Sequence, residues 1–180
     1  MNLCVYGAAS DKVAPIYFEK VTDLGEKMAK RGYDLIYGGG DTGMMGAIAR
    51  GVKKGGGKVF GVAPKYFDEP GVLFPDCDEM TYTDTIRIRK QVMEDGAVGF
   101  IATPGGIGTF DELFEMITLM QLDQTEKPIV VFNINGYFDP FVAMLHNMVE
   151  EGFLKETIFG RFGIFKTAEE VLDYIDQNRK

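Results

Sequence analysis

Three glycine-rich turns constrain the fold of this 180-residue chain more than any other feature. Each turn directly follows a short run of apolar residues and precedes a segment with helical patterning. The turns lie at Gly7, Gly38–Gly40 and Gly105–Gly108. Short apolar runs that end in glycine are typical of strands buried on both faces. A chain that alternates such strands with helices is expected to form a parallel sheet covered by helices on both sides.

The same alternation extends over the whole chain. Strands are expected at residues 3–6, 33–37, 58–63, 79–82, 97–102, 129–132 and 163–165. Helices are expected at 12–31, with Ser10 or Asp11 as the cap, and at 43–54, 84–95, 109–121, 139–150 and 168–177. The segment 65–78 contains Pro70 and Pro75 and is expected to be a loop. We find no repeat and no linker, so residues 1–180 are expected to form a single Rossmann-like domain with a doubly wound parallel sheet.

Composition excludes several classes of function. The formal net charge of −8 argues against a surface for nucleic acid or for an anionic membrane. No apolar run reaches the length needed to span a bilayer. Cys4 and Cys77 are far apart in the sequence, which favours free thiols and a cytoplasmic protein. His146 is the only histidine and is expected to be a packing or surface residue, so we expect neither a metal site nor a cofactor.

Two of the glycine turns have the pattern of an anion site. Parallel strands place their carboxyl ends at one edge of the sheet, where ligands bind. In the segment 37–46, glycines lead into a helix N-terminus, so that Gly39, Gly40 and Gly43 are candidate ligand contacts. The alternative is a tight turn without a ligand. The segment 102–112 has the same order of strand, glycine turn and helix, and two such turns at one edge favour a bound phosphate.

Glu112 has two interpretations. Thr109 and Glu112 have the spacing of a capping box, in which the glutamate only accepts a hydrogen bond from the helix cap. Thr167 and Glu170 have the same spacing without a glycine turn before them. Because Glu112 lies in the first turn after the proposed anion site, it is also a candidate catalytic carboxylate. Glu115, three residues later, is the second candidate.

Arg89 is a candidate site residue because of its place on the expected helix 84–95. At about 100° per residue, this helix has one apolar side. The apolar side is formed by Ile86, Ile88, Val92 and Met93. Arg89 falls within this arc, where an arginine needs an anionic partner, either a substrate or a structural carboxylate. Arg87 lies on the polar side and is expected to be solvated.

These motifs resemble those of the LOG-type phosphoribohydrolases. The family signature P-G-G-x-G-T-x-x-E is matched in full by residues 104–112, and residues 38–46 match G-G-G-x-x-G-L-M-G with Met44 in place of leucine. Residues 61–65 are similar to the family's G-V-I-P-K, and Arg89 with Lys90 matches its R-K pair. The likeness covers residues 3–153. The chain departs from the family's M-H-x-R-K at Ile86 and Arg87 and has Leu119 where an aromatic residue is frequent.

The resemblance implies a Rossmann-like fold, a homodimer or larger homo-oligomer, and a nucleoside 5′-monophosphate as the partner molecule. The reaction it implies is hydrolysis of the N-glycosidic bond of N6-substituted adenosine 5′-monophosphates to the free base and ribose 5-phosphate. Arg89 and Glu112 are then catalytic. The implied substrate-binding residues are Lys90, Gly105, Gly106, Ile107, Gly108, Thr109 and Thr118.

Two other functions share these sequence features. A carrier of a nucleotide or phosphorylated cofactor, similar to the molybdenum-cofactor carrier proteins, needs the glycine turns but no carboxylate beside a sugar. A nucleotide-dependent transferase needs a metal or an acceptor base, and the sequence offers no candidate for either. Arg89 and Glu112 therefore discriminate between an enzyme and a carrier.

Overall fold

The computed structural model describes residues 1–179 and contains one seven-stranded sheet, with every neighbouring pair of strands parallel. The order across the sheet is β4-β3-β2-β1-β5-β6-β7. The strands are β1 Asn2–Tyr6, β2 Asp34–Tyr37, β3 Val59–Pro64, β4 Glu79–Thr83, β5 Gly99–Ala102, β6 Ile129–Phe132 and β7 Gly163–Phe165. The helices are α1 Pro15–Lys30, α2 Gly43–Lys54, α3 Ile86–Gly96, α4 Ile107–Gln121, α5 Asp139–Glu150 and α6 Ala168–Asn178. The expected doubly wound Rossmann-like fold is thereby confirmed.

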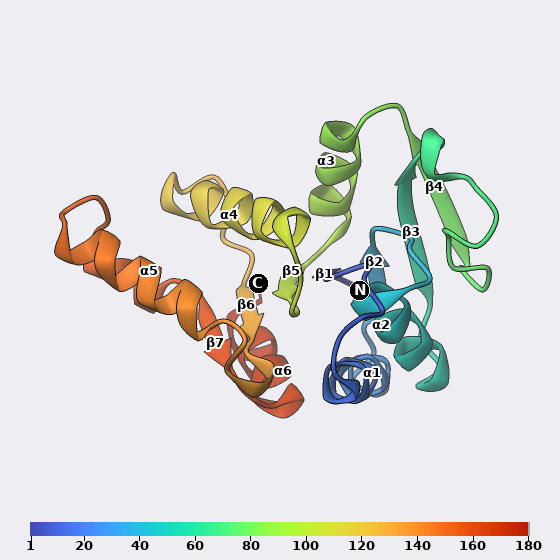
Figure 1. Cartoon of the computed structure of the whole chain (residues 1–180), viewed down its shortest axis with the longest axis horizontal. Coiled ribbons are helices and arrows are strands. Elements are labelled where there is room, and N and C mark those ends of the chain that lie inside the picture. The colour runs from blue at the N-terminus through green and yellow to red at the C-terminus, as the bar shows by residue number, and fades with distance from the viewer. Residues whose placement is uncertain (180) are drawn as a thin grey trace.

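Two hydrophobic cores lie on the two faces of the sheet. Side chains alternate between faces along a strand, so Leu3 and Val5 of β1 join one core while Cys4 and Tyr6 join the other. The first core receives side chains from α1, α2 and α6, and the second from α3, α4 and α5. Figure 1 shows α1, α2 and α6 gathered below the sheet and α3 and α4 above it. The near-continuous apolar strands follow from burial on both faces.

The strand order reverses between β1 and β5, and this reversal positions the candidate site. Tyr6 and Ala102, the last residues of these strands, are paired across the sheet. The turns that follow them therefore begin at the same edge, on either side of a crevice between helices that run to opposite faces. In open parallel sheets, such a reversal is where ligands bind.

Three helices begin later or earlier than the sequence predicts, and one of them is α3, which starts at Ile86 instead of residue 84. The first helix starts at Pro15 after Ala14, and neither Ser10 nor Asp11 caps it. Instead, the carboxylate of Asp11 accepts a hydrogen bond from the backbone N–H of Gly43, at 2.7 Å. Helix α4 starts at Ile107 with Gly106 at its N-cap. Thr109 is therefore inside the helix, and the capping box that its spacing with Glu112 suggests is not formed.

The segment 65–78 has more structure than a simple loop. Lys65–Phe67 forms one 3-10 turn. The segment then runs antiparallel to the second glycine turn, because the N–H of Asp41 donates to the carbonyl of Val72 at 3.0 Å and the N–H of Phe74 donates to the carbonyl of Gly39 at 2.8 Å. This pairing holds residues 71–73 over the edge of the sheet.

Within residues 1–179, no helix combines the length and the apolar character needed to cross a membrane.

Candidate active site

A cavity of about 640 Å³ opens at the strand reversal. Its lining comes from three turns that follow strands, from α3 and α4, and from the segment that runs beside the second glycine turn. The lining residues include Ala8, Gly38, Gly40, Met45, Phe67, Val72, Leu73, Arg89, Gly106, Gly108, Thr109 and Glu112. A cavity of this size is typical of a small-molecule site.

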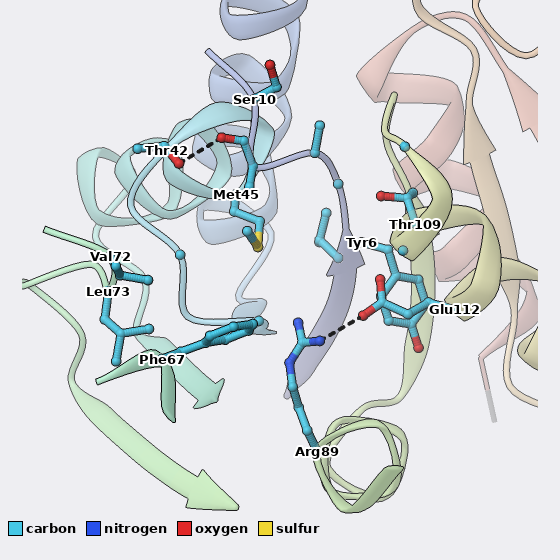
Figure 2. A pocket seen from close by; sticks show the side chains of 18 of the residues that line it. Tyr6, Ser10, Thr42, Met45, Phe67, Val72, Leu73, Arg89, Thr109 and Glu112 are labelled. Carbon is cyan, nitrogen blue, oxygen red and sulfur yellow. Dashed lines mark hydrogen bonds and ion pairs between the residues drawn. The ribbon is translucent and has the colours of Figure 1, made fainter. Parts of the chain in front are cut away.

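Arg89 and Glu112 meet inside this cavity. A guanidinium nitrogen of Arg89 lies 3.3 Å from a carboxylate oxygen of Glu112, and the two side chains are only 12% and 10% exposed. Figure 2 shows them pointing toward one another from α3 and α4. Arg89 is fixed by a second contact, since its Nε donates to the carbonyl of Val62 at 3.0 Å. The inward direction predicted for Arg89 is correct, whereas Ile88, predicted on the same apolar side, is 48% exposed.

The environment of Glu112 changes its acidity. Burial raises the pKa of this carboxyl from 4.5 to about 7, because the ionised form loses its hydration. The positive charges of Arg89 and Lys90 act in the opposite direction and offset only part of this effect. Near neutral pH, Glu112 is therefore able both to hold and to release its proton. A carboxyl with such a pKa is suited to proton transfer and to charge stabilisation at a reacting centre.

The N-terminus of α4 presents free hydrogen-bond donors. Within residues 1–179, none of the backbone N–H groups from Gly105 to Thr109 donates a hydrogen bond, and no side chain caps the helix at Gly106. Three successive carbonyls before and at the start of the helix, those of Pro104, Gly105 and Gly106, each accept a hydrogen bond. A helix N-terminus with unpaired N–H groups favours an anion. Gly106, Gly108 and Thr109 also line the cavity.

The N-terminus of α2 differs, because its donors are already used. The N–H of Gly43 donates to Asp11, and the N–H of Met44 donates to the carbonyl of Ala8 at 2.8 Å. Gly43 has a φ of +61°, and a Cβ there would lie 2.3 Å from the carbonyl oxygen of Ala8. Gly40 lines the cavity, whereas Gly39 and Gly43 do not. In this structure the N–H groups at the α2 terminus thus have acceptors within the protein, and the binding roles expected for Gly39, Gly40 and Gly43 stay predictions.

Lys90 and Thr118 lie away from the cavity in this chain. Lys90 pairs with Asp111 at 3.0 Å and with Glu115 at 2.7 Å, so it joins α3 to the outer side of α4. Thr118 is exposed, and its hydroxyl donates to the carbonyl of Phe114 at 2.7 Å. Gly105 and Ile107 contribute to the α4 terminus without lining the cavity. The binding roles of these four residues stay predictions.

One wall of the cavity was not found from the sequence. Met45, Phe67, Val72 and Leu73 form an apolar surface, and Figure 2 shows it across the cavity from Glu112. Residues 67–73 reach the site only because they pair with the second glycine turn. This pairing is non-local and has no periodic signal in the sequence. A capping box does form at Thr167 and Glu170, as its spacing predicts.

Comparison with known proteins adds an independent line of evidence. A family described as "Possible lysine decarboxylase" matches residues 45–175. The cytokinin riboside 5′-monophosphate phosphoribohydrolase of Mycobacterium tuberculosis (strain ATCC 25618 / H37Rv) is 37% identical over 171 residues, which are 95% of this chain and 91% of that protein. The probable cytokinin riboside 5′-monophosphate phosphoribohydrolase LOGL3 of Oryza sativa subsp. japonica is 34% identical over 174 residues, 97% of this chain and 82% of that protein.

Among solved structures, the molybdenum cofactor carrier protein of Chlamydomonas reinhardtii superposes with a TM-score of 0.71 over 98% of this chain and 96% of its own. Its identity of 19% shows a shared fold and no more. The phosphoribohydrolases, in contrast, are similar in sequence over almost the whole chain. From this similarity and the family match, the chain belongs to the LOG family of enzymes.

Proposed function

We propose that this protein hydrolyses the N-glycosidic bond of adenosine 5′-monophosphates that carry an N6 substituent, releasing the free base and ribose 5-phosphate. The observation that carries the proposal is the Arg89–Glu112 pair, which shares one cavity with the open N-terminus of α4. The names of the relatives support the same activity, since both are called cytokinin riboside 5′-monophosphate phosphoribohydrolases.

The 5′-phosphate is proposed to bind at the N-terminus of α4. The free N–H groups from Gly105 to Thr109 and the positive end of the helix dipole favour a dianion there. They supply this local field in a chain whose net charge is −8. The phosphate does not react, so its binding free energy holds the ribose against Glu112 and lowers the barrier to the chemical step.

Glu112 is proposed to act on the sugar in its ionised form. Breaking the bond between C1′ and the base nitrogen builds positive charge on the ribose, and a carboxylate beside C1′ stabilises that charge. The same carboxylate takes a proton from the attacking water as its oxygen bonds to C1′. The electrons of the broken bond leave with the base, and its nitrogen gains the equivalent of the proton that Glu112 took from water, which returns Glu112 to its ionised form. Arg89, held by the carbonyl of Val62, is proposed to bind ribose oxygens beside this carboxylate.

The apolar wall is proposed to receive the base and its substituent. Met45, Phe67, Val72 and Leu73 offer no charge to a polar ligand, and they lie across the cavity from Glu112. An apolar group on N6 gains free energy when this surface is removed from water. We therefore expect a preference for substituted bases over unmodified AMP.

The competing function is that of a carrier for a nucleotide or phosphorylated cofactor. It accounts for the α4 anion site but gives no role to a buried carboxylate with a pKa near 7. Incubation of the protein with AMP and with N6-isopentenyl-AMP, followed by chromatography of the products, separates the two. Release of free base at a rate proportional to protein concentration supports the enzyme. Tight binding of both nucleotides without any release of base would favour the carrier.

A further inference from the structure

Tyr137 contacts the turn at Gly105 and Gly106, just before α4, from outside the cavity. Its hydroxyl donates a hydrogen bond to the carbonyl of Gly105 at 2.5 Å. Tyr137 comes from the connection between β6 and α5, far from the turn in sequence, and does not line the cavity. This hydroxyl is the donor that satisfies the Gly105 carbonyl among the described residues.

The geometry of the peptide group gives this contact a consequence. No peptide bond in the described chain is cis. In a trans peptide the carbonyl and the N–H of the next residue point in opposite directions. By holding the carbonyl of Gly105 on its own side, Tyr137 directs the N–H of Gly106 to the opposite side, and Gly106 lines the cavity. A reversed peptide would present a carbonyl oxygen to the anion in place of a donor.

The backbone preferences of Gly105 and Gly106 alone do not fix the direction of the peptide between them, because neither residue has a Cβ. Gly105 and Gly106 are adjacent, and glycine has access to backbone conformations that other residues avoid. The carbonyl of Pro104 is held separately by the N–H of Ala8, at 3.3 Å, and the carbonyl of Gly106 is held by the N–H of Phe110. The peptide between Gly105 and Gly106 is therefore the one whose direction depends on Tyr137.

A rigid frame holds Tyr137 in place. Asn133, which is 3% exposed, follows β6 and uses both ends of its side-chain amide. Its oxygen accepts from the N–H of Phe138 at 2.8 Å, and its nitrogen donates to Asp139 at 2.7 Å. The turn before Tyr137 contains Asn135 at a φ of +52°, a conformation that costs free energy in a non-glycine residue. The frame keeps this strained turn, and so the tyrosine, in one arrangement.

We propose that Tyr137 is a positioning residue for the phosphate: its hydroxyl fixes the Gly105–Gly106 peptide so that the α4 terminus presents donors to the anion. The inference rests on the proposed function, which places the 5′-phosphate at this terminus. Tyr137 does not touch the substrate and takes no part in proton transfer. Its loss therefore weakens the recognition of the phosphate and leaves the recognition of the base unchanged.

The test measures binding with Tyr137→Phe, which removes only the hydroxyl. Tyr17→Phe is the matched control, because the Tyr17 ring packs edge-on against Tyr137 and its hydroxyl has no hydrogen-bond partner among the described residues. Ribose 5-phosphate and adenosine are titrated separately into each variant and into the unmodified protein by calorimetry. We expect Tyr137→Phe to bind ribose 5-phosphate roughly five- to tenfold more weakly, which corresponds to the net free energy of one hydrogen bond. Adenosine binding, and both affinities of Tyr17→Phe, should stay at the level of the unmodified protein.

Three results would overturn the proposal. The first is an affinity of Tyr137→Phe for ribose 5-phosphate equal to that of the unmodified protein. The second is an equal loss for ribose 5-phosphate and adenosine, which would indicate a general loosening of the site. The third is an unmodified protein that binds no ribose 5-phosphate. If the unmodified protein releases base from N6-isopentenyl-AMP while either of the first two results is found, the proposed function stands and only the role of Tyr137 fails.

Discussion

The carboxylate of Glu112 faces the guanidinium of Arg89 at 3.3 Å inside the cavity, and yet burial keeps the pKa of Glu112 at about 7. A surface carboxylate paired with arginine has a lowered pKa, so here desolvation exceeds the attraction between the charges. Because burial disfavours the ionised form of Glu112, the pair contributes little to the stability of the fold. A carboxyl with this pKa is instead suited to a role in catalysis.

The first prediction concerns the pH dependence of activity. If Glu112 acts in its ionised form, kcat/KM should increase as pH rises through about 7, the pKa of this group in the free protein. The measurement is kcat/KM for N6-isopentenyl-AMP between pH 5 and pH 9 (about two units either side of that pKa). A decrease through pH 7 would instead mean that Glu112 acts as a proton donor.

The second prediction concerns the pH dependence of stability. The folded pKa of Glu112 is raised above its ordinary 4.5, so the folded state retains this proton to higher pH than the unfolded chain. Its contribution to the free energy of unfolding should therefore fall by about 3 kcal/mol as pH rises from 4.5 to about 7, and then level off. Denaturant titrations of the unmodified protein and of Glu112→Gln should diverge across this interval. If the free energy of unfolding of both proteins depended on pH in the same way, burial would not raise the pKa of Glu112.

A third prediction separates the two helix termini. Asp11→Ala removes the carboxylate that accepts from the N–H of Gly43 and should lower the free energy of unfolding by about 1 kcal/mol, as the loss of a helix cap does. The affinity for ribose 5-phosphate should not change if the anion binds at α4, because Asp11 already accepts the N–H of Gly43 at the α2 terminus. Glu19→Ala, an exposed acidic residue on α1, is the charge-matched control. A marked gain or loss of affinity for ribose 5-phosphate in Asp11→Ala, but not in Glu19→Ala, would indicate that the phosphate binds at the α2 terminus.

A fourth prediction concerns the phosphate of the substrate. If the α4 terminus holds the 5′-phosphate, the nucleoside loses the group that positions its ribose. Catalytic efficiency on N6-isopentenyladenosine should then be on the order of a hundredfold lower than on its 5′-monophosphate. If Arg89 binds the phosphate, Arg89→Ala should reduce the ratio of catalytic efficiencies between nucleotide and nucleoside. We place Arg89 at the ribose and therefore expect Arg89→Ala to lower the efficiency on both substrates by a similar factor. Equal efficiencies of the unmodified protein on nucleoside and nucleotide would mean that no anion site is used.

Local pattern was enough to predict the elements of this fold. The strands at Ile129–Phe132 and Gly163–Phe165 and the helices at Gly43–Lys54 and Asp139–Glu150 have the predicted bounds, because their apolar periodicity ends at clear turn residues. Arg89 was identified by the same means, since an arginine on the apolar side of a helix needs a buried partner.

The features that the sequence did not reveal depend on contacts between distant segments. Asp11 has the chemistry of a helix cap, but which helix it caps depends on how the turn after β1 meets α2. The apolar wall at Phe67, Val72 and Leu73 depends on the pairing of its segment with Gly39 and Asp41. Tyr137 reaches Gly105 only because β5 and β6 are neighbours in the sheet.

The central claim is that Glu112 is a catalytic residue and not a helix-capping residue. Glu112→Gln tests this claim most directly. The amide keeps the shape of the side chain and removes its charge, and Glu170→Gln, in the capping box of α6, is the control. The measurement is the turnover of N6-isopentenyl-AMP by each variant, with the melting temperature recorded beside it. We predict that Glu112→Gln loses roughly a hundredfold or more in turnover without a fall in melting temperature, whereas Glu170→Gln keeps full turnover. Equal turnover in the two variants would contradict a catalytic role for Glu112.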